Sequence, residues 1–461
     1  MIMKRKVIAG MLTAVMAASL LAGCGGESSE APADTADTTN AAEEATAPEE
    51  EATADSEEAS SDDEEKAASD VTLEWEITAT GEKVDMYQEV ADAFTEETGI
   101  KVELVTPGSN YETVMKTRMA SGDLPDLWET HGWSVARYSE YLRPLNDQDW
   151  FDRMDESILP VISDADGNVY CVPIGEGLNT ISYNKDVFED AGVNPADILT
   201  WSDYEEACEK IKASGVTPIF CGDKDSSTIA QLAESIPPAF LTLSCVEDNQ
   251  AENLKAGSFD FETYWTPINE MIDGWMQKGY FNEDILTSDN DQAVQALAKG
   301  EAGMVYGGSN NILMALTYNP DANLGYLACP GLKDGDNTFL SIGEGACIGM
   351  WKDTEHEEEC LQLLSFLASP EICEKICTFS GDIPGFKDVT NEDSVVTKAF
   401  RESQSTWGNI EYVPLFDREF MPSGMWDDLG VGLTKLILDP GNAIKDSADY
   451  LQEAYNTKMA Q

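Results

Sequence analysis

The chain has 461 residues, which allows two or three domains at ~100–200 residues each. Its 87 acidic and 28 basic side chains give a formal net charge of −59. Phosphate contacts need clustered lysine and arginine, so this balance argues strongly against nucleic-acid binding and against docking on an anionic membrane through protein charge. The two histidines, His131 and His356, are too few for a histidine-rich zinc site.

The first segment, residues 1–23, is typical of an export signal. Three basic residues precede the apolar stretch 7–20, which is too short for a confident membrane-spanning helix. The stretch ends in the sequence LAGC at residues 21–24. This sequence resembles the bacterial lipobox, in which the cysteine is lipidated and becomes the mature N-terminus. We therefore expect a lipid anchor at Cys24, the alternative being a plain signal peptide with an incidental cysteine; two or three acyl chains give stable anchoring.

The next segment, residues 24–70, is low in complexity and strongly acidic. Ala, Glu, Asp, Ser and Thr dominate, aromatic residues are absent, and Lys66 is its one basic residue. Such a segment buries too little apolar area to offset the entropy of ordering, so we expect a disordered tether that lifts a folded domain off the lipid. An acidic interaction tail is the alternative.

From residue 71 onward, apolar runs of strand type alternate with amphipathic segments of helix type. Gly99 and Gly122 are expected to end helices, and Thr200 with Asp203 and Thr354 with Glu357 each form a potential capping box. This alternation favours α/β layers with largely parallel sheets, and nearly 400 residues of it suggests two lobes. The predicted elements in chain order are strand 71–77, helix 84–98, strand 100–105, helix 110–121, strands 127–129, 168–172 and 179–183, helix 201–214, strand 216–220 and a helix from 357 to 368.

Enzyme signatures are weak in this sequence. It contains no G-x-S-x-G nucleophile motif and no P-loop, and its nine cysteines after Cys24 include no CxxC pair. Because nine is odd, at least one thiol is free even if the others pair. We therefore expect no catalytic residue, cofactor or metal site. Paired carboxylates for glycoside hydrolysis stay open as an alternative, because acidic residues are everywhere.

Tryptophans next to glycine suggest a ligand that stacks on aromatic rings. Trp133, Trp407 and Trp426 lie in segments that read as loops, beside polar residues. Sugar faces stack on indole rings while amides and carboxylates bind the hydroxyl groups. Core packing is the alternative for each tryptophan alone.

Several sequence blocks, taken in order, resemble one family. They read FTEETGIKV at 94–102, MASGDLPDL at 119–127, GNVYCVPIGEGLNTISYN at 167–184 and KGEAGMVYG at 299–307, with weaker matches at 185–201 and 369–384. They resemble the family 1 extracellular solute-binding proteins of ABC importers, the group that includes maltodextrin-binding protein. The resemblance covers nearly all of residues 71–461.

The resemblance implies an α/β, two-lobed, periplasmic-binding-protein-like fold of type II, in which each lobe is a β-sheet flanked by helices and a hinge joins the lobes. By position, the first lobe comprises 71–177 and 331–378, the second comprises 181–324 and 380–461, and the chain crosses between them near 178–180, 325–330 and 379. The implied function is a lipid-anchored receptor on the outer face of the bacterial cytoplasmic membrane. It captures a carbohydrate, in particular an oligosaccharide, in the interlobe cleft and delivers it to an ABC permease, acting as a monomer.

The same resemblance, carried over position by position, implies a set of ligand contacts. The loop at 307–310 lacks the tryptophan that relatives often have there, which argues against a maltodextrin ligand and leaves Asn310 as the local candidate. Glu344, Asp382 and Trp407 follow from loop position alone. The complete predicted set is Glu82, Asn110, Tyr111, Glu129, His131, Trp133, Glu176, Asn179, Asn310, Glu344, Asp382, Trp407 and Trp426.

Two alternative functions stay open at this point. One is a receptor of the same fold for another solute, such as a polyamine, which would exploit the negative charge, or a peptide. The other is a surface glycoside hydrolase, which would need two carboxylates ~5–9.5 Å apart across a cleft.

Overall fold

The computed structural model describes residues 70–224 and 226–460, and within them it leaves the side chains of residues 109, 226 and 227 undescribed. The predicted signal peptide, the lipidation residue Cys24 and all but the last residue of the predicted linker lie outside the described residues. Among the described helices, none combines the length and apolar character needed to cross a bilayer.

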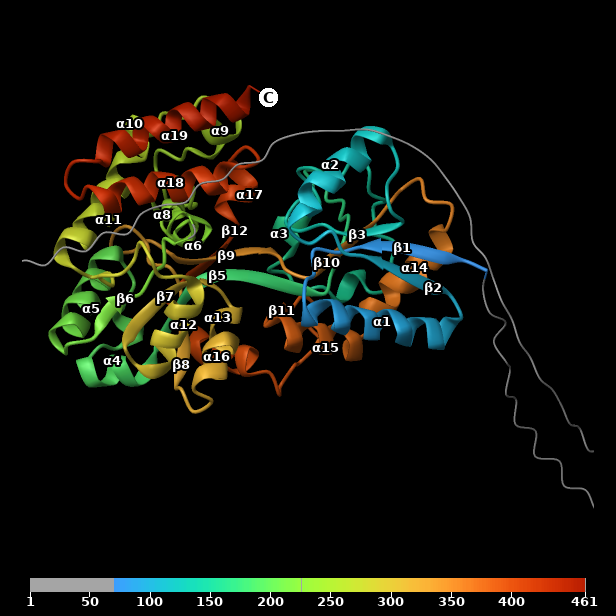
Figure 1. Ribbon diagram of the computed structural model, residues 1–461, viewed down its shortest axis with the longest axis horizontal. Coiled ribbons are helices and arrows are strands. Elements are labelled where there is room, and N and C mark those ends of the chain that lie inside the picture. The colour runs from blue at the N-terminus through green and yellow to red at the C-terminus, as the bar shows by residue number, and fades with distance from the viewer. Residues whose placement is uncertain (1–69, 225, 461) are drawn as a thin grey trace, which may run out of the picture. The chain divides into compact units, whose positions relative to one another are not determined.

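The first of two sheets has the strand order β2-β1-β3-β10-β4 (Figure 1). Strands β1, β2 and β3 are parallel, whereas β10 is antiparallel to both of its neighbours. We call this sheet and its helices the first lobe. Its strands are β1 (Thr72–Glu76), β2 (Lys101–Val105), β3 (Leu127–Glu129), β4 (Val172–Pro173) and β10 (Cys347–Met350).

The second sheet is larger and has the order β12-β9-β5-β7-β6, with β8 and β11 also paired to β5. The long strand β5 is antiparallel to β7, β8, β9 and β11, while β12 is parallel to β9 and β6 to β7. We call this sheet and its helices the second lobe. Its strands are β5 (Gly175–Asn184), β6 (Thr217–Ile219), β7 (Ala302–Gly308), β8 (Leu324–Leu327), β9 (Thr338–Glu344), β11 (Ile383–Pro384) and β12 (Ile410–Pro414).

Helices cover both sheets and connect most of the strands. They are α1 (Glu82–Thr98), α2 (Tyr111–Ser121), α3 (Leu159–Ile162), α4 (Lys185–Ala191), α5 (Trp201–Ala213), α6 (Ser226–Ile229), α7 (Gln231–Ser235), α8 (Pro237–Leu241), α9 (Ala251–Lys255), α10 (Phe261–Tyr264), α11 (Thr266–Lys278), α12 (Asn290–Lys299), α13 (Asn310–Tyr318), α14 (Glu357–Leu367), α15 (Pro370–Ser380), α16 (Val395–Gln404), α17 (Phe416–Phe420), α18 (Met425–Leu438) and α19 (Ile444–Met459). Short 3-10 turns lie at Gly108–Asn110, Phe151–Arg153 and Pro195–Asp197.

Local sequence accounts for several of these boundaries. Helices α1 and α2 end at Gly99 and Gly122, which adopt the left-handed conformation with φ of 79° and 72° that glycine reaches without steric cost. The predicted capping box at Thr200 is confirmed, since its hydroxyl accepts a hydrogen bond from the Asp203 amide at 3.2 Å while the Asp203 carboxylate accepts one from the Thr200 amide at 2.8 Å. These ends were readable from sequence because each is set within one helical turn.

The first lobe has a core on each face of its sheet. Leu127 packs with α1, α14 and α15, whereas the next residue, Trp128, packs on the opposite face with Tyr111 of α2 and with Tyr138. Adjacent strand residues point to opposite faces, so a three-residue strand serves both cores. The second lobe builds its own core from aromatic side chains of α5, α11 and α17 to α19.

The chain passes from one sheet to the other at two places that touch. Ile174 joins β4 to β5, and residues 345 and 346 join β9 to β10. A Cβ atom added to Gly345 would lie 2.7 Å from the carbonyl oxygen of Gly175, so the two crossing backbones are in direct contact. We call this contact, residues 174–177 and 344–347, the crossing.

Three expectations from the sequence need correction. The sheets are mixed rather than largely parallel, because crossing strands enter each sheet against its other strands. Strand β9, which the predicted boundary at 331 placed in the first lobe, pairs with β5 and β12 in the second sheet. The capping box at Thr354 does not form, because α14 begins only at Glu357, with His356 as its N-cap; the Thr354 hydroxyl accepts a hydrogen bond from the His356 amide at 3.1 Å and donates one to the Asp126 carboxylate.

Candidate functional site

A cavity of about 230 Å³ opens where β5 enters the second lobe. Its walls come from β5, the end of β7, helix α7, helix α17 with the residue before it, and the first turn of α18. Ligands of open α/β folds bind at such strand ends, where loops from several elements converge. The lining residues are Gly177, Leu178, Asn179, Gln231, Glu234, Gly308, Leu415, Asp417, Arg418 and Trp426.

An amide pair forms one wall of this cavity. The Asn179 side-chain oxygen accepts a hydrogen bond from the Ser235 hydroxyl at 2.6 Å, and its nitrogen donates to the Gln231 side-chain oxygen. These bonds orient both amides. Among the described residues, the Gln231 side-chain nitrogen donates to no partner, so it remains free to donate to a ligand.

Two buried acids lie beside the amides. The Glu234 carboxylate accepts hydrogen bonds from the backbone amides of Phe416 and Asp417 at the start of α17. Burial, together with the nearby Asp417 carboxylate, raises the pKa of Glu234 well above its usual range, and burial also raises the pKa of Asp417. Burial therefore favours the neutral form of both acids over the charged form.

The remaining wall is made by Arg418 and Trp426. The Arg418 guanidinium lies 3.7 Å from the Asp417 carboxylate, and its terminal nitrogens donate no hydrogen bond within the described part of the chain. Trp426, in the first turn of α18, is half-buried and lines the cavity. An accessible indole beside unpaired donors suits a ligand that has both apolar faces and hydroxyl groups.

Arg418 also reaches the first lobe. Its guanidinium lies 4.9 Å from the Trp133 ring, and the guanidinium of Arg137 lies 4.1 Å from the same ring. Trp133 thus contacts two cations, and the residue itself is only 7 % exposed. A second cavity, of about 50 Å³, shares Leu415 and Arg418 with the first and extends to Gly132 and Glu344. The two cavities therefore follow the facing surfaces of the two lobes.

The end of β3 lies three residues before Gly132, which lines the smaller cavity. The Glu129 carboxylate accepts hydrogen bonds from the Thr78 amide at 2.7 Å and hydroxyl at 2.5 Å, and lies 3.8 Å from the Lys83 ammonium. The Tyr111 hydroxyl donates to the Glu129 carbonyl oxygen. The polar groups at the end of β3 are therefore hydrogen-bonded or ion-paired mainly with one another.

His131 follows β3 in the left-handed conformation, with φ of 50°. Burial and the nearby Arg418 guanidinium lower the pKa of His131, so its ring is neutral at pH 7. A neutral imidazole can both donate and accept a hydrogen bond. The strained backbone conformation marks this turn as one that the surrounding packing holds in place.

Two more predicted acids lie buried at the crossing. Glu344 accepts hydrogen bonds from the Ser134 amide at 3.0 Å and from the hydroxyls of Ser134 and Thr130. Glu176 accepts one from the Ser157 hydroxyl at 2.9 Å, and burial raises the pKa of Glu176 to about 8. Through these hydrogen bonds, both acids connect the crossing to neighbouring loops.

Of the predicted residues, Asn179 and Trp426 line the larger cavity and Glu344 lines the smaller one, whereas Tyr111, Glu129, His131, Trp133, Glu176 and the residues that follow are not in either lining. Glu82 and Asn110 are exposed at the starts of α1 and α2, and Asn310 is exposed at the start of α13. Asp382 accepts a hydrogen bond from the Ser380 hydroxyl at 2.8 Å, and burial raises its pKa. Trp407 packs on Phe400 at 5.2 Å between ring centroids and donates to the Tyr326 carbonyl at 3.1 Å.

Sequence reasoning missed four of the polar residues that line the larger cavity: Gln231, Glu234, Asp417 and Arg418. They come from two short helices that are far apart in the chain, and no motif surrounds them. The single available signal was the mixture of aromatic, acidic and basic residues at 416–420, which sits directly after an apolar strand.

A larger open groove, of about 960 Å³, lies elsewhere, between α1 and the pair α14 and α15. Its lining residues come from these three helices and the turns beside them, and none of them belongs to the second sheet. We therefore place the candidate ligand site in the two cavities at the crossing.

Comparison with known proteins agrees with this architecture. Residues 89–401 match the profile of the bacterial extracellular solute-binding proteins. The chain belongs to this family. The extracytoplasmic location that we expected from the sequence agrees with the family, whose members work outside the cytoplasm.

Individual relatives of the family extend the match over most of the chain. The melibiose/raffinose/stachyose-binding protein of Bacillus subtilis (strain 168) is 26 % identical over 365 residues, which is 78 % of this chain and 84 % of the relative. A B. subtilis structure described as a binding protein in an open conformation has a TM-score of 0.78 at 27 % identity, covering 85 % of this chain and 98 % of that one. A sugar transporter of Bacillus licheniformis in complex with stachyose has a TM-score of 0.71 at 29 % identity, covering 84 % and 100 %. These matches confirm the predicted two-lobed fold.

Proposed function

We propose that this solute-binding protein captures an oligosaccharide in the cavities at the crossing and delivers it to an ABC importer. The observation that carries the proposal is the set of unpaired donors around Trp426. The Gln231 amide nitrogen and the Arg418 guanidinium line the same cavity as one half-buried indole, together with the buried Glu234 and Asp417. Sugars offer hydroxyl groups to such donors and C–H faces to such a ring.

The relatives support the same ligand class. The B. subtilis relative is named for binding melibiose, raffinose and stachyose, and the B. licheniformis structure holds stachyose. We propose that this chain takes oligosaccharides of similar size. The neutral His131 and the donors of the second lobe provide contacts to hydroxyl groups without placing a bare negative charge against the ligand.

We further propose that Cys24 carries the lipid anchor and that residues 25–70 hold the folded part away from the membrane. The LAGC sequence behind a basic and apolar leader supports the anchor. The protein would act as a monomer and present its ligand-bound form to the permease, because ligand shifts the equilibrium between open and closed lobes by its difference in affinity for the two forms.

A thermal-shift screen of the full chain tests the ligand class. Ligand that binds the folded state raises the melting temperature by mass action. We expect a concentration-dependent shift with raffinose, stachyose or melibiose and none with spermidine or tripeptides. A shift with spermidine alone would favour the polyamine receptor, and cleavage of the glycan during incubation would favour a hydrolase.

A further inference from the structure

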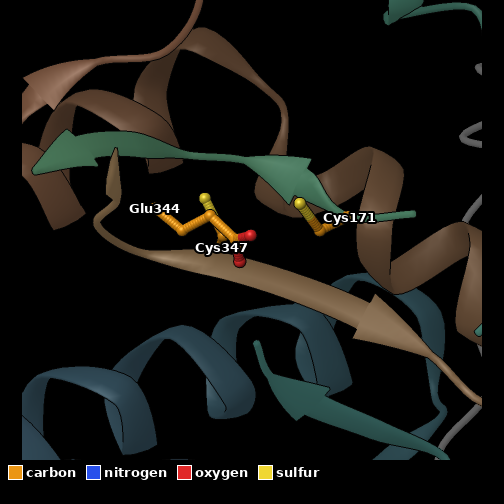
Figure 2. Close-up of side chains that lie close together, drawn as sticks. All are labelled: Cys171, Glu344 and Cys347. Atoms are coloured by element: carbon orange, nitrogen blue, oxygen red, sulfur yellow. The ribbon is translucent and has the colours of Figure 1, made fainter. Parts of the chain in front are cut away.

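Three potential metal ligands meet at the crossing, beside the proposed sugar site. The sulfur atoms of Cys171 and Cys347 and a carboxylate oxygen of Glu344 all lie within 4.8 Å of one another. Figure 2 shows the two sulfur atoms and the carboxylate gathered in one place, with Cys171 coming from a different segment than the other two. We propose that these three side chains bind a thiophilic divalent cation of the zinc class.

The register of the first sheet explains why the thiols meet. Cys347 pairs with Pro173 across the antiparallel strands β10 and β4. Cys171 precedes Pro173 by two residues, so its side chain is on the same face of the sheet as Cys347, one position along the diagonal. Both thiols are completely buried.

This diagonal placement suits a metal better than a disulfide. Cα atoms of diagonal neighbours lie ~7–8 Å apart, whereas a disulfide needs ~4.4–6.8 Å. A tetrahedral zinc ion with Zn–S bonds of ~2.3 Å places its ligand atoms roughly 3.5–3.8 Å apart. Small side-chain rotations bring the three ligand atoms from within 4.8 Å of one another to that separation.

Hydrogen bonds leave Glu344 able to ligate. One carboxylate oxygen accepts from both the amide and the hydroxyl of Ser134, and the other accepts from the Thr130 hydroxyl; the Gly132 backbone amide also donates to this carboxylate. A carboxylate has about four lone-pair sites, so these bonds do not prevent it from binding a cation. Thr130 also donates its amide to the Cys347 carbonyl at 2.9 Å. Thr130 therefore orients two of the three ligands, as neighbouring groups do around protein metal sites.

The chemistry and access of the site define the ion. Two thiolates with one carboxylate suit zinc rather than magnesium or calcium, which prefer oxygen ligands alone. Of the three ligands, Glu344 lines the cavity of about 50 Å³, whereas both thiols are fully buried behind it. Because the ligands come from both crossing segments, the ion would fasten β4 and β10 to the end of β9.

The test is a titration of the reduced full chain with Co²⁺, a spectroscopic substitute for zinc, in the absence of sugar. We expect thiolate-to-cobalt absorption that saturates at one equivalent and is displaced by Zn²⁺. Cys171→Ala and Cys347→Ala should each weaken binding at least tenfold. Cys360→Ala removes a buried thiol of α14 outside the cluster and should bind like the wild type.

X-ray absorption of the zinc-loaded wild type gives a second measurement that depends on no variant. Two sulfur and two oxygen or nitrogen neighbours would support the site. No stoichiometric binding, equal affinity in all three variants, a different number of sulfur neighbours, or a Cys171–Cys347 disulfide in the purified protein would each overturn it. Because no sugar is present, failure of this proposal is separate from failure of the proposed sugar-binding function.

Discussion

The crossing and the second-lobe cavity contain the same kinds of side chain but differ in the hydrogen-bond partners that these side chains have. At the crossing, Glu344 and Glu176 accept hydrogen bonds from neighbouring protein groups and are nearly inaccessible to solvent. In the cavity, Gln231 and Arg418 have donors without a partner among the described residues, and Trp426 is half-buried beside open volume. A polar residue such as Glu176 can therefore lie near the junction of the lobes without lining either cavity.

The tryptophans show the same contrast. Trp426 lines the cavity, Trp133 is held between two guanidinium groups, and Trp407 is packed against Phe400. An indole binds a sugar only if part of its face is free when ligand arrives. The comparison predicts that substitutions at the crossing change stability, whereas substitutions in the cavity change affinity.

The largest expected effect is the pH dependence that Glu176 gives to stability. Because its pKa rises from 4.5 to about 8 on folding, the folded state keeps a proton that the unfolded chain has lost. The contribution is complete below pH 4.5 and is lost as the pH rises toward 8. At about 1.4 kcal/mol per pKa unit, the loss is on the order of 4 kcal/mol.

Urea unfolding of the wild type and Glu176→Gln between pH 4.5 and 8.5 measures this effect. Glutamine resembles the protonated acid, so the variant should lose less stability as the pH rises. Equal pH dependence in the two proteins would show that Glu176 is ionised in the folded state. That result would contradict the raised pKa on which this prediction rests.

The next effect is on affinity. Trp426→Ala removes the one indole that lines the larger cavity, and losing an aromatic contact of about 1.5–3 kcal/mol weakens binding roughly 10- to 100-fold. Isothermal titration with the sugar that gives the largest thermal shift measures this change, and the unfolding free energy of the empty protein should be nearly unchanged.

Trp407→Ala is the matched control. It removes a ring that packs on Phe400 and donates to the Tyr326 carbonyl, so it should lower the free energy of unfolding by about 2–4 kcal/mol while sugar affinity stays the same. If Trp407→Ala weakened binding and Trp426→Ala did not, the site would have to be moved toward α16.

A smaller effect is expected from closing the space between the crossing backbones. In Gly345→Ala, the new Cβ would lie 2.7 Å from the Gly175 oxygen and 2.8 Å from the Gly177 nitrogen, which forces the segments apart. We expect a loss of about 1–3 kcal/mol in unfolding free energy. Gly274→Ala in α11, where a Cβ meets no atom within 4 Å, should instead stabilise the chain by up to ~1 kcal/mol.

The smallest expected effect is on the free energy of unfolding and comes from the contact between Arg137 and Trp133. Arg137→Met removes the cation 4.1 Å from the Trp133 ring together with its ion pair to Glu112, and should cost about 0.5–1 kcal/mol of unfolding free energy. Denaturant midpoints are precise enough to detect this. Arg143→Met breaks ion pairs with Asp147 and Glu357 but removes no ring contact, so it should cost less; a larger cost there would mean that surface charge rather than ring contact decides.

Much of the local structure could be predicted from the sequence. Gly99 and Gly122 end helices, and Thr200 caps one, because each boundary depends on conformation and hydrogen bonds within one turn. Thr354 fits the same capping pattern but does not cap α14, because that helix begins only at Glu357 and the Thr354 hydroxyl accepts from the His356 amide instead. A pattern of residue types therefore does not by itself fix the residue at which a helix begins.

The site was less predictable. The sequence pointed to Glu129, His131, Asn179 and Trp426, and of these Asn179 and Trp426 line the larger cavity. Gln231 and Arg418 were missed, because a cavity wall is made by residues that share a place in space and no pattern in the chain. The sheet assignment of β9 was likewise decided by its pairing partners, which lie far away in sequence.

The sequence by itself determined the alternation of strands and helices, the helix ends and the order of family blocks, since these depend on residues close together in the chain. Only the tertiary structure decided which tryptophan lines a cavity and which acids accept hydrogen bonds from neighbouring residues. It also decided which two of the nine thiols lie beside Glu344. Those outcomes depend on solvent access and on contacts between distant segments. The periodicity of apolar residues can be read from the chain, whereas the burial of a residue depends on the segments that pack around it in the folded protein.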